Sequence, residues 1–446
     1  MTRPMPPFSS VILCLLASIT PTVATAQETV RYEIEVEAGE HDRVNVPVKV
    51  TIRYQPADPQ VTLQGDDGSQ IDGQLTESGS QSRLRLSDLH FVIPSLPAGE
   101  RRTYQLDLPL APSSVRRPPP EQPVENIAGQ FTWHDTPGEQ SDLRFGDRSV
   151  LRYMHHTYDG TSKESHEKTK KIFHHLFDPA TGKQLLTKGP GGLYSHHRGV
   201  FYGFSQLRYG DGQTADIWHC HNGESQRHVQ FFRVEAGPIF GRHQMQIAWH
   251  GTDGQVFANE GRAVSVFNVP GGTLLEFASR LVSTDGPLVI DGDPQHAGFQ
   301  FRAAQEVAES TKGETYYLRP DGRDQPGKTR NWDIKNTGQE SNRQTENLLW
   351  NAMSFVVGGK RYTALYIDHP ENPKPARYSE RDYGRFGSYF EKTLDSASEQ
   401  PENRSLDVRY RLWIQEGEMT VEEAASMSAA FVEPPKVSAQ LNRAEE

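Results

Sequence analysis

Apolar and polar residues alternate in short runs along the first quarter of the chain, and turn-forming sequences separate these runs. Residues 30–36, for example, read Val-Arg-Tyr-Glu-Ile-Glu-Val. A period of two places every second side chain on the same face of a β-strand. Similar runs occur at 44–54, 60–63, 83–86 and 103–108. We therefore predict a small accessory β-sandwich over residues 27–110.

The same period continues in the rest of the chain, in longer and more aromatic runs. Strands are expected at 199–207, 229–234, 243–249, 263–269, 273–282, 361–368 and 405–415. One helix is predicted over 421–431, because Thr420 can cap it and Glu423 occupies the capping-box position. Many strands without helical crossovers favour an antiparallel arrangement. The predicted fold class is all-β, with a large antiparallel β-sandwich over residues 125–434.

Three segments fall outside these two domains. Residues 1–26 hold a short apolar run and end in Ala24-Thr25-Ala26, which is typical of a secretory signal cleaved after Ala26. Residues 111–124 are rich in proline, so a linker is expected there. Residues 435–446 are polar, and we predict a disordered tail. The protein is thus expected to be exported, to the periplasm or the outside of the cell.

Charge and cysteine content narrow the classes of partner. The formal net charge is −11, and loss of Arg3 with the signal would change it to −12. Such a surface repels phosphate backbones and argues against a nucleic-acid partner. No segment after the signal is apolar enough to span a membrane. Without the signal the chain keeps one cysteine, Cys220, so no intramolecular disulfide is expected. The sequence does not predict the oligomeric state.

Histidine is the residue that points most directly to a functional site. Of 17 histidines, only His41 and His90 precede the predicted large domain. A single histidine on a strand is more often a surface or hydrogen-bonded residue than a ligand, but here histidines come in close groups. These groups are His155-His156, His174-His175, His196-His197 and His219-Cys220-His221.

His219 and His221 form the first candidate site. On a strand, both rings would point to one face, the spacing used by metal-binding sheets, while Cys220 would point away. A third ligand could come from His197, His296 or Glu260. A divalent metal held by these residues is one hypothesis, and ordinary strand histidines are the other.

His196-His197-Arg198 forms the second candidate, after a Gly-Pro turn. In an extended segment His196 and Arg198 would share one face, and His197 would occupy the other. The guanidinium fork suits anionic or polyhydroxylated ligands, and an imidazole can act as general acid or base. Tyr194, Tyr202 and Trp218 could stack on sugars, although such rings on a strand are as readily explained by a core.

Further polar residues could complete a site. His296 and Arg302 share parity on a strand that follows an acidic turn. His369 and Tyr383 lie in segments that could form the rim of a cleft. Glu260 and Arg262 could join the site, or form a structural ion pair at a strand edge.

Three segments carry a family resemblance. They are Gly-Pro-Gly-Gly-Leu-Tyr-Ser-His-His-Arg-Gly-Val-Phe (189–201), Ile-Asp-His-Pro-Glu-Asn-Pro (367–373) and Asp-Tyr-Gly-Arg-Phe (382–386). Residues 130–432 resemble the PmoA-like proteins. The resemblance implies a β-sandwich similar to the galactose mutarotase-like supersandwich, and carbohydrate as the substrate class. The family is named after a methane oxygenase subunit with several membrane spans, an activity that a chain without such spans excludes.

The leading hypothesis is an exported enzyme that transfers protons on a sugar or oligosaccharide, as an epimerase or a lyase does. Its expected catalytic residues are His196, His197, Arg198, Glu260, His296 and His369. Its expected substrate contacts are Tyr194, Tyr202, Trp218, Arg262, Arg302 and Tyr383. Two alternatives stay open: a metal-dependent hydrolase or oxygenase that uses His219 and His221, and a glycan-binding protein without catalysis.

Overall fold

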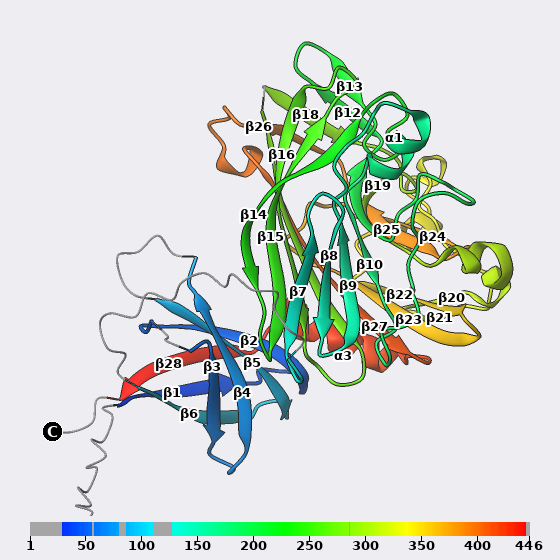
Figure 1. Ribbon diagram of the computed structural model, residues 1–446. Coiled ribbons are helices and arrows are strands. Elements are labelled where there is room, and N and C mark those ends of the chain that lie inside the picture. The colour runs from blue at the N-terminus through cyan, green and yellow to red at the C-terminus, as the bar shows by residue number, and fades with distance from the viewer. Residues whose placement is uncertain (1–28, 56–57, 80–85, 110–126, 285, 443–446) are drawn as a thin grey trace, which may run out of the picture.

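The computed structural model describes residues 29–55, 58–79, 86–109, 127–284 and 286–442. These residues form a smaller N-terminal β unit and a larger β unit (Figure 1). The all-β prediction is confirmed, because sheets make up both units and helices are few. The predicted signal at 1–26 and the predicted linker at 111–124 lie outside the described residues. Within the described part of the chain, no helix has the length and apolarity needed to cross a membrane.

The N-terminal unit is one antiparallel sheet of seven strands, in the order β2-β5-β4-β3-β6-β1-β28. Its strands are β1 (Thr29–Glu37), β2 (Arg43–Ile52), β3 (Gln60–Gly65), β4 (Gln70–Glu77), β5 (Ser87–Leu96), β6 (Arg101–Pro109) and β28 (Lys436–Asn442). The two end strands, β2 and β28, contact each other, so the sheet curls around its own core. Ile34, Phe91 and Leu106 are buried in that core.

The prediction of a disordered tail is wrong over residues 436–442. This segment forms β28, which pairs with β1 along its whole length, with Ala439 opposite Ile34. Val437 and Ala439 pack against the core of the N-terminal unit. The open edge of β1 offers unpaired backbone groups, and a polar segment can satisfy them as well as an apolar one. The last described strand, β28, therefore pairs with the first, β1.

The large unit contains two extensive antiparallel sheets. The eight-stranded sheet comprises, in spatial order, β24 (Arg377–Arg381), β25 (Arg385–Tyr389), β19 (Ala297–Arg302), β11 (Val200–Phe204), β10 (Phe173–Leu176), β9 (Arg148–Met154), β8 (Gln140–Phe145) and β7 (Phe131–Thr136). The nine-stranded sheet comprises β14 (Ser225–Glu235), β15 (Phe240–His250), β16 (Val256–Phe267), β17 (Thr273–Ser283), β27 (Leu406–Glu416), β23 (Lys360–Asp368), β22 (Trp350–Val357), β20 (Tyr316–Arg319) and β21 (Gly322–Arg323).

Smaller elements complete this unit. A four-stranded sheet comprises β13 (Gln213–Ala215), β12 (Gln206–Tyr209), β18 (Pro287–Asp291) and β26 (Lys392–Asp395). The helices are α1 (Lys163–Thr169), α2 (Glu340–Arg343) and α3 (Val421–Val432), with single turns at 307–311, 312–314, 334–336 and 401–403. The predicted late helix is confirmed as α3. The Thr420 side chain accepts from the Glu423 N–H, and the Glu423 carboxylate accepts from the Thr420 N–H in return.

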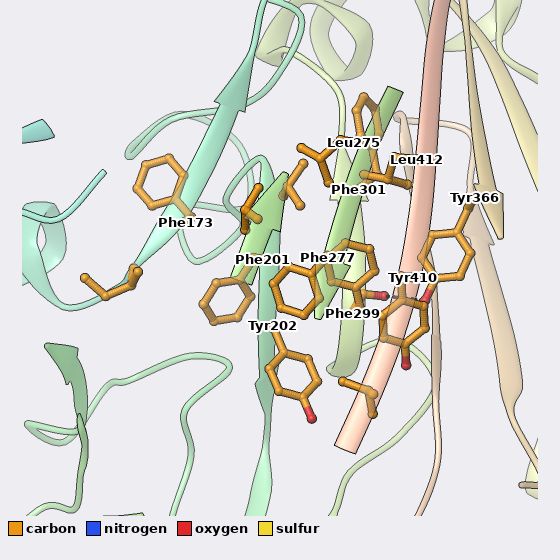
Figure 2. Packing of buried hydrophobic residues seen from close by; sticks show 14 of the residues in the cluster. Phe173, Phe201, Tyr202, Leu275, Phe277, Phe299, Phe301, Tyr366, Tyr410 and Leu412 are labelled. Carbon is orange, nitrogen blue, oxygen red and sulfur yellow. Dashed lines mark hydrogen bonds between the residues drawn. The ribbon is translucent and has the colours of Figure 1, made fainter. Parts of the chain in front are cut away.

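Aromatic side chains fill the space between the two large sheets (Figure 2). Phe299 of β19 stacks on Tyr410 of β27, with ring centres 4.6 Å apart. Tyr202 of β11 lies 5.8 Å from Phe277 of β17. Full burial of each such ring contributes about 1.5–3 kcal/mol to folding. The large sandwich is therefore held by ring packing from both sheets.

This packing fixes which side chains of the eight-stranded sheet point away from the core. Phe299 and Phe301 face the nine-stranded sheet, so Gln300 and Arg302 of the same strand face the other way. Arg385 of β25 is opposite Arg302 in the register and projects with it. These polar side chains are buried nonetheless. Loops therefore cover the outer face of the sheet here.

Candidate functional site

Three loops bring His196, His219 and His296 together. Each ring has a nitrogen within 4.8 Å of a nitrogen from the other two. The ring centres are 4.6 Å apart for His196 and His219, 4.9 Å for His219 and His296, and 6.1 Å for His196 and His296. All three side chains are half-buried. This group is called the three-histidine centre below.

Aspartates orient two of these rings. Nδ1 of His219 lies 2.7 Å from Asp216 Oδ2, and Nδ1 of His296 lies 2.9 Å from Asp293 Oδ2. Burial works against ionisation of both aspartates, but hydrogen bonds from the histidines outweigh it, and the pKa of each carboxyl is lowered. In a neutral imidazole whose Nδ1–H donates to a carboxylate, Nε2 carries the lone pair and is free to bind a ligand.

His196 supplies the third ring and is held neutral. Its Nε2 is buried and has no hydrogen-bond partner among the described residues. Burial, together with the nearby Lys171 ammonium and His219, lowers the pKa of His196 to about 2. A neutral imidazole is the form that binds a metal ion.

Two buried cations hold the loops of the centre in place. The Lys171 ammonium donates to the carbonyl of His196 at 2.6 Å and to that of Trp218. Burial lowers the pKa of Lys171 to about 7. The Arg385 guanidinium donates to the carbonyl of Pro294 at 3.1 Å and to that of the next residue. The loops that carry the three histidines are therefore anchored to the sheet and to one another.

The predicted division of His196 and His197 between two faces is wrong. Residues 194–198 form a turn, in which the His197 N–H donates to the Tyr194 carbonyl at 2.9 Å. The ring centres of His196 and His197 are 4.3 Å apart, so both rings lie at the centre. Arg198 turns away and donates to the carboxylate of Glu167 at 3.1 Å. A turn breaks the period of two on which the prediction depended.

His219 and His221 do not form the predicted pair on a strand either. They lie in a loop in which Cys220 has φ of 52°. His221 is exposed and stacks on His219 with ring centres 5.3 Å apart, but it is outside the group whose nitrogens converge. His219 combines instead with His196 and with His296, which the sequence had suggested as a third ligand.

The structure places Glu260 and Arg262 between the large sheets. Nε of Arg262 lies 2.7 Å from Glu260 Oε1, and both side chains are fully buried. Trp249 and Ser279 also donate to the Glu260 carboxylate, each at 2.9 Å. These contacts make the pair part of the core packing.

His369 and Tyr202 also lie away from the three-histidine centre. His369 packs on Phe431 of α3, with ring centres 5.2 Å apart. Tyr202 is part of the aromatic core (Figure 2). Trp218, by contrast, lies beside the centre, with its ring 6.3 Å from that of His296.

A second group of predicted contacts adjoins the centre. Tyr194 stacks on Tyr383 with ring centres 4.4 Å apart, and His197 stacks on Tyr194 at 5.5 Å. The Arg302 guanidinium lies 5.1 Å from the centre of the Tyr383 ring. The name tyrosine pocket is used below for this packed group of side chains, Tyr194, His197, Arg302 and Tyr383.

Sequence reasoning missed the residues that orient the centre, namely Asp216, Asp293 and Lys171. The two aspartates had a detectable signal. Asp216-x-x-His219 and Asp293-x-x-His296 share the same spacing, which allows a side chain to bond with a ring one turn later. Lys171 had none, because its role depends on two backbone carbonyls from distant loops.

The donor set fits a divalent metal ion. Three converging imidazoles, two of them backed by carboxylates, are the ligand type of catalytic zinc sites, which keep a coordination position open for water or substrate. Cys220 is buried, and burial raises the pKa of its thiol to about 12, so it is not a thiolate ligand.

The chain belongs to DUF6807, a family of unknown function, which matches residues 140–429. The resemblance to PmoA-like proteins is therefore wrong, since the match indicates no such family. The segments that carried the resemblance, 189–201, 367–373 and 382–386, lie within the DUF6807 match.

Other comparisons add no functional assignment. No curated protein matches the chain. Among solved structures, an alpha-mannosidase from Enterococcus faecalis V583 is 9% identical, with a TM-score of 0.41 over 95% of this chain and 47% of that one. A glycosyl hydrolase family 38 protein from Enterococcus faecalis is 10% identical, with a TM-score of 0.41 over 94% and 48%. The chain spans about half the length of these proteins.

Proposed function

We propose that this member of a family of unknown function is a metal-dependent enzyme that hydrolyses a polar, oxygen-rich substrate, with sugars as the leading class. The observation that carries the proposal is the convergence of His196, His219 and His296, with ring nitrogens within 4.8 Å of one another. The signal-like residues 1–26 support export as part of the same proposal.

The side chains at the centre have distinct roles in this proposal. His196, His219 and His296 would hold a divalent ion, and Asp216 and Asp293 would keep two of the rings in the binding tautomer. Such an ion supplies a polarised substrate oxygen and a bound water of lowered pKa. His197 offers its unpartnered Nδ1 to a substrate hydroxyl, and burial keeps its pKa far below the ordinary value, so the ring stays neutral.

Aromatic and polar groups beside the centre support a sugar as substrate. Tyr194 presents a partly exposed ring next to Tyr383. Flat rings of this kind pack against the apolar faces of sugars while hydroxyl groups take the hydrogen bonds. The proton-transfer chemistry predicted from the sequence would use the same residues, and analysis of the product separates an epimer or an unsaturated sugar from a hydrolysed one.

Elemental analysis of the purified protein tests the metal. We expect about one divalent ion per chain, bound stoichiometrically as in catalytic zinc sites. His219→Ala and His296→Ala should each weaken this binding strongly, because one of three ligands is lost, while His41→Ala, an exposed histidine of the N-terminal unit, should leave it unchanged. An absence of metal after reconstitution with zinc, cobalt and manganese would overturn the proposal.

Turnover tests the chemistry. The metal-loaded protein should cleave at least one member of a panel of glycosides and oligosaccharides, and chelation followed by metal addition should remove and restore the activity. Binding of a glycan without any product, in a protein shown to hold its metal, would instead favour the non-catalytic alternative.

A further inference from the structure

Arg302 is a buried cation without an anion. Its side chain is 0% exposed, on the outer face of β19. Its Nη1 amino group donates to the carbonyls of Ala303, Tyr383 and Gly384. The other amino nitrogen, Nη2, is written NH2 below. Nε and NH2 are buried and have no hydrogen-bond partner among the described residues. A buried charge that lacks a partner is costly, so fully buried arginines are ordinarily paired.

Two other buried arginines of this chain follow that rule. Arg262 is paired with Glu260 at 2.7 Å, and Arg319 with Glu380 through Nε at 2.7 Å. Arg385, next to Arg302 in the sheet, also has no carboxylate partner among the described residues. Both of its terminal amino groups nevertheless donate hydrogen bonds, one to the Ser379 hydroxyl and the other to backbone carbonyls. Arg302 differs from all of these because one edge of its guanidinium, Nε with NH2, is left free.

The Arg302 guanidinium belongs to the tyrosine pocket. The Tyr383 ring lies 5.1 Å from the Arg302 guanidinium and carries the Tyr194 ring above it. His197, 6.0 Å from Tyr383, also has a buried and unpartnered nitrogen, Nδ1. Two polar side chains with unpartnered nitrogens, from different parts of the chain, therefore both lie close to the Tyr383 ring.

The charges around the pocket would favour an anion. Burial lowers the pKa of Arg302 to about 10, which leaves the guanidinium charged at neutral pH. Lys188 and Arg385 are the nearby cations that interact with it electrostatically. An anion placed at the free edge would thus be attracted by several positive groups in a medium of low dielectric constant.

Tyr194 covers one face of the Tyr383 ring at the surface of the protein. It is 45% exposed, and its φ of 55° is unusual for a residue other than glycine. It follows Gly191 and Gly192, both with positive φ, at the end of an exposed turn. Strained residues of this kind often occur at ligand-binding segments.

We propose that the free edge of Arg302 binds a carboxylate of the substrate, which enters when Tyr194 moves aside. Nε and NH2 form a planar pair of donors that matches the two oxygens of a carboxylate. This inference rests on the proposed function, since the pocket adjoins the three-histidine centre. It narrows the substrate class to acidic sugars, or similar polar carboxylates, that place one group on Arg302 and the reacting bond at the centre.

Titration with ¹³C-labelled acetate, followed by NMR, tests the pocket directly. The wild type should bind acetate, and Arg302→Gln should weaken this binding by about tenfold or more, the effect of losing a charge-assisted pair of hydrogen bonds. Arg280→Gln is the matched control, because Arg280 is exposed and paired with Asp407 far from the pocket. Tyr194→Ala should make binding faster or tighter by removing the ring that covers Tyr383.

Several outcomes would contradict the binding of a carboxylate by Arg302. Equal acetate binding by the wild type and Arg302→Gln would overturn the inference, as would a lack of acetate binding by Tyr194→Ala. If Arg302→Gln does not fold, Arg302→Lys takes its place, since it keeps the charge but loses the planar fork. Sulfate that binds more tightly than acetate would contradict the assignment to a carboxylate.

Two additional measurements keep this inference separate from the proposed function. Glucuronate should bind more tightly than glucose to the wild type, and this preference should disappear in Arg302→Gln. Metal content measured on the same samples should be unchanged by Arg302→Gln. A protein that binds metal but does not distinguish glucuronate from glucose refutes the pocket alone, whereas one that binds no metal refutes the proposed function.

Discussion

The large unit contains two groups of histidines, and the surroundings of their ring nitrogens differ. At the three-histidine centre the nitrogens of His196, His219 and His296 converge, and two rings have a carboxylate behind them. The second group surrounds Tyr153 and is formed by His155, His174, His228 and His243. In this group the rings stack: His174 lies 5.0 Å from Tyr153, and His243 lies 3.3 Å from Trp133.

The second group behaves as part of the core. Neither ring nitrogen of His174 has a partner among the described residues, and burial holds its pKa well below the ordinary value. His155 does contact a carboxylate, but this belongs to Asp135 at the surface. The comparison teaches that a high density of histidines does not mark a metal site. The proposed metal site rests instead on convergent nitrogens with carboxylates behind them, and substitutions should change stability in one group and metal affinity in the other.

The largest expected effect concerns the ion pair behind the second group. Glu260→Gln leaves Arg262 buried without its counter-charge, which should lower the free energy of unfolding by about 3–5 kcal/mol. Asp407→Asn, which removes an exposed partner of Arg280, should cost less than about 1 kcal/mol. Urea unfolding compares the two. If the Glu260→Gln protein folds but no longer binds metal, the assignment of Glu260 to the core is contradicted.

A smaller effect separates the carboxylates of the two groups. Asp216→Asn should lower metal affinity by about 10–100-fold, because it removes the acceptor that orients His219. Asp135→Asn is the matched control, since it removes the carboxylate behind His155 and should leave metal affinity unchanged. Competition with a chelating dye measures both. Equal losses of metal affinity in the two variants would contradict the proposed difference between the two groups of histidines.

The smallest expected effect is the pH dependence of stability. His228 has an ordinary pKa of 6.5, which burial lowers to about 4 in the folded protein. Between these values the unfolded chain binds more protons, so the stabilisation is complete above pH 6.5 and is lost as the pH falls toward 4. His228→Gln should make this decline shallower, whereas His41→Gln, in the N-terminal unit, should not. A free energy of unfolding that stays constant from pH 7.5 to pH 4.5 would refute this role.

The sequence predicted the fold better than the site, for physical reasons. Alternation sets which side chains enter a core, so the strands and the all-β class could be predicted from local pattern. The helix could be predicted because Thr420 and Glu423 cap it through local hydrogen bonds. β28 could not, because its pairing with β1 joins opposite ends of the chain through backbone groups that every sequence has.

The candidate site lies in loops, where the alternation of apolar and polar residues does not predict the direction of a side chain. His196 and His197 were assigned to opposite faces because a strand was assumed where the chain turns. His219 and His296 were both candidates, but only the fold shows that they meet. The repeated Asp-x-x-His spacing was the local signal available, and it marks two of the three rings of the three-histidine centre.

The most direct test of the three-histidine centre is X-ray absorption spectroscopy of the cobalt-substituted protein. The account predicts one bound ion whose spectrum shows three imidazole ligands in the wild type, with one imidazole lost in His219→Ala and none lost in His228→Ala. A cobalt ion with an unchanged set of imidazole ligands in His219→Ala, or no specifically bound ion in the wild type, would contradict it.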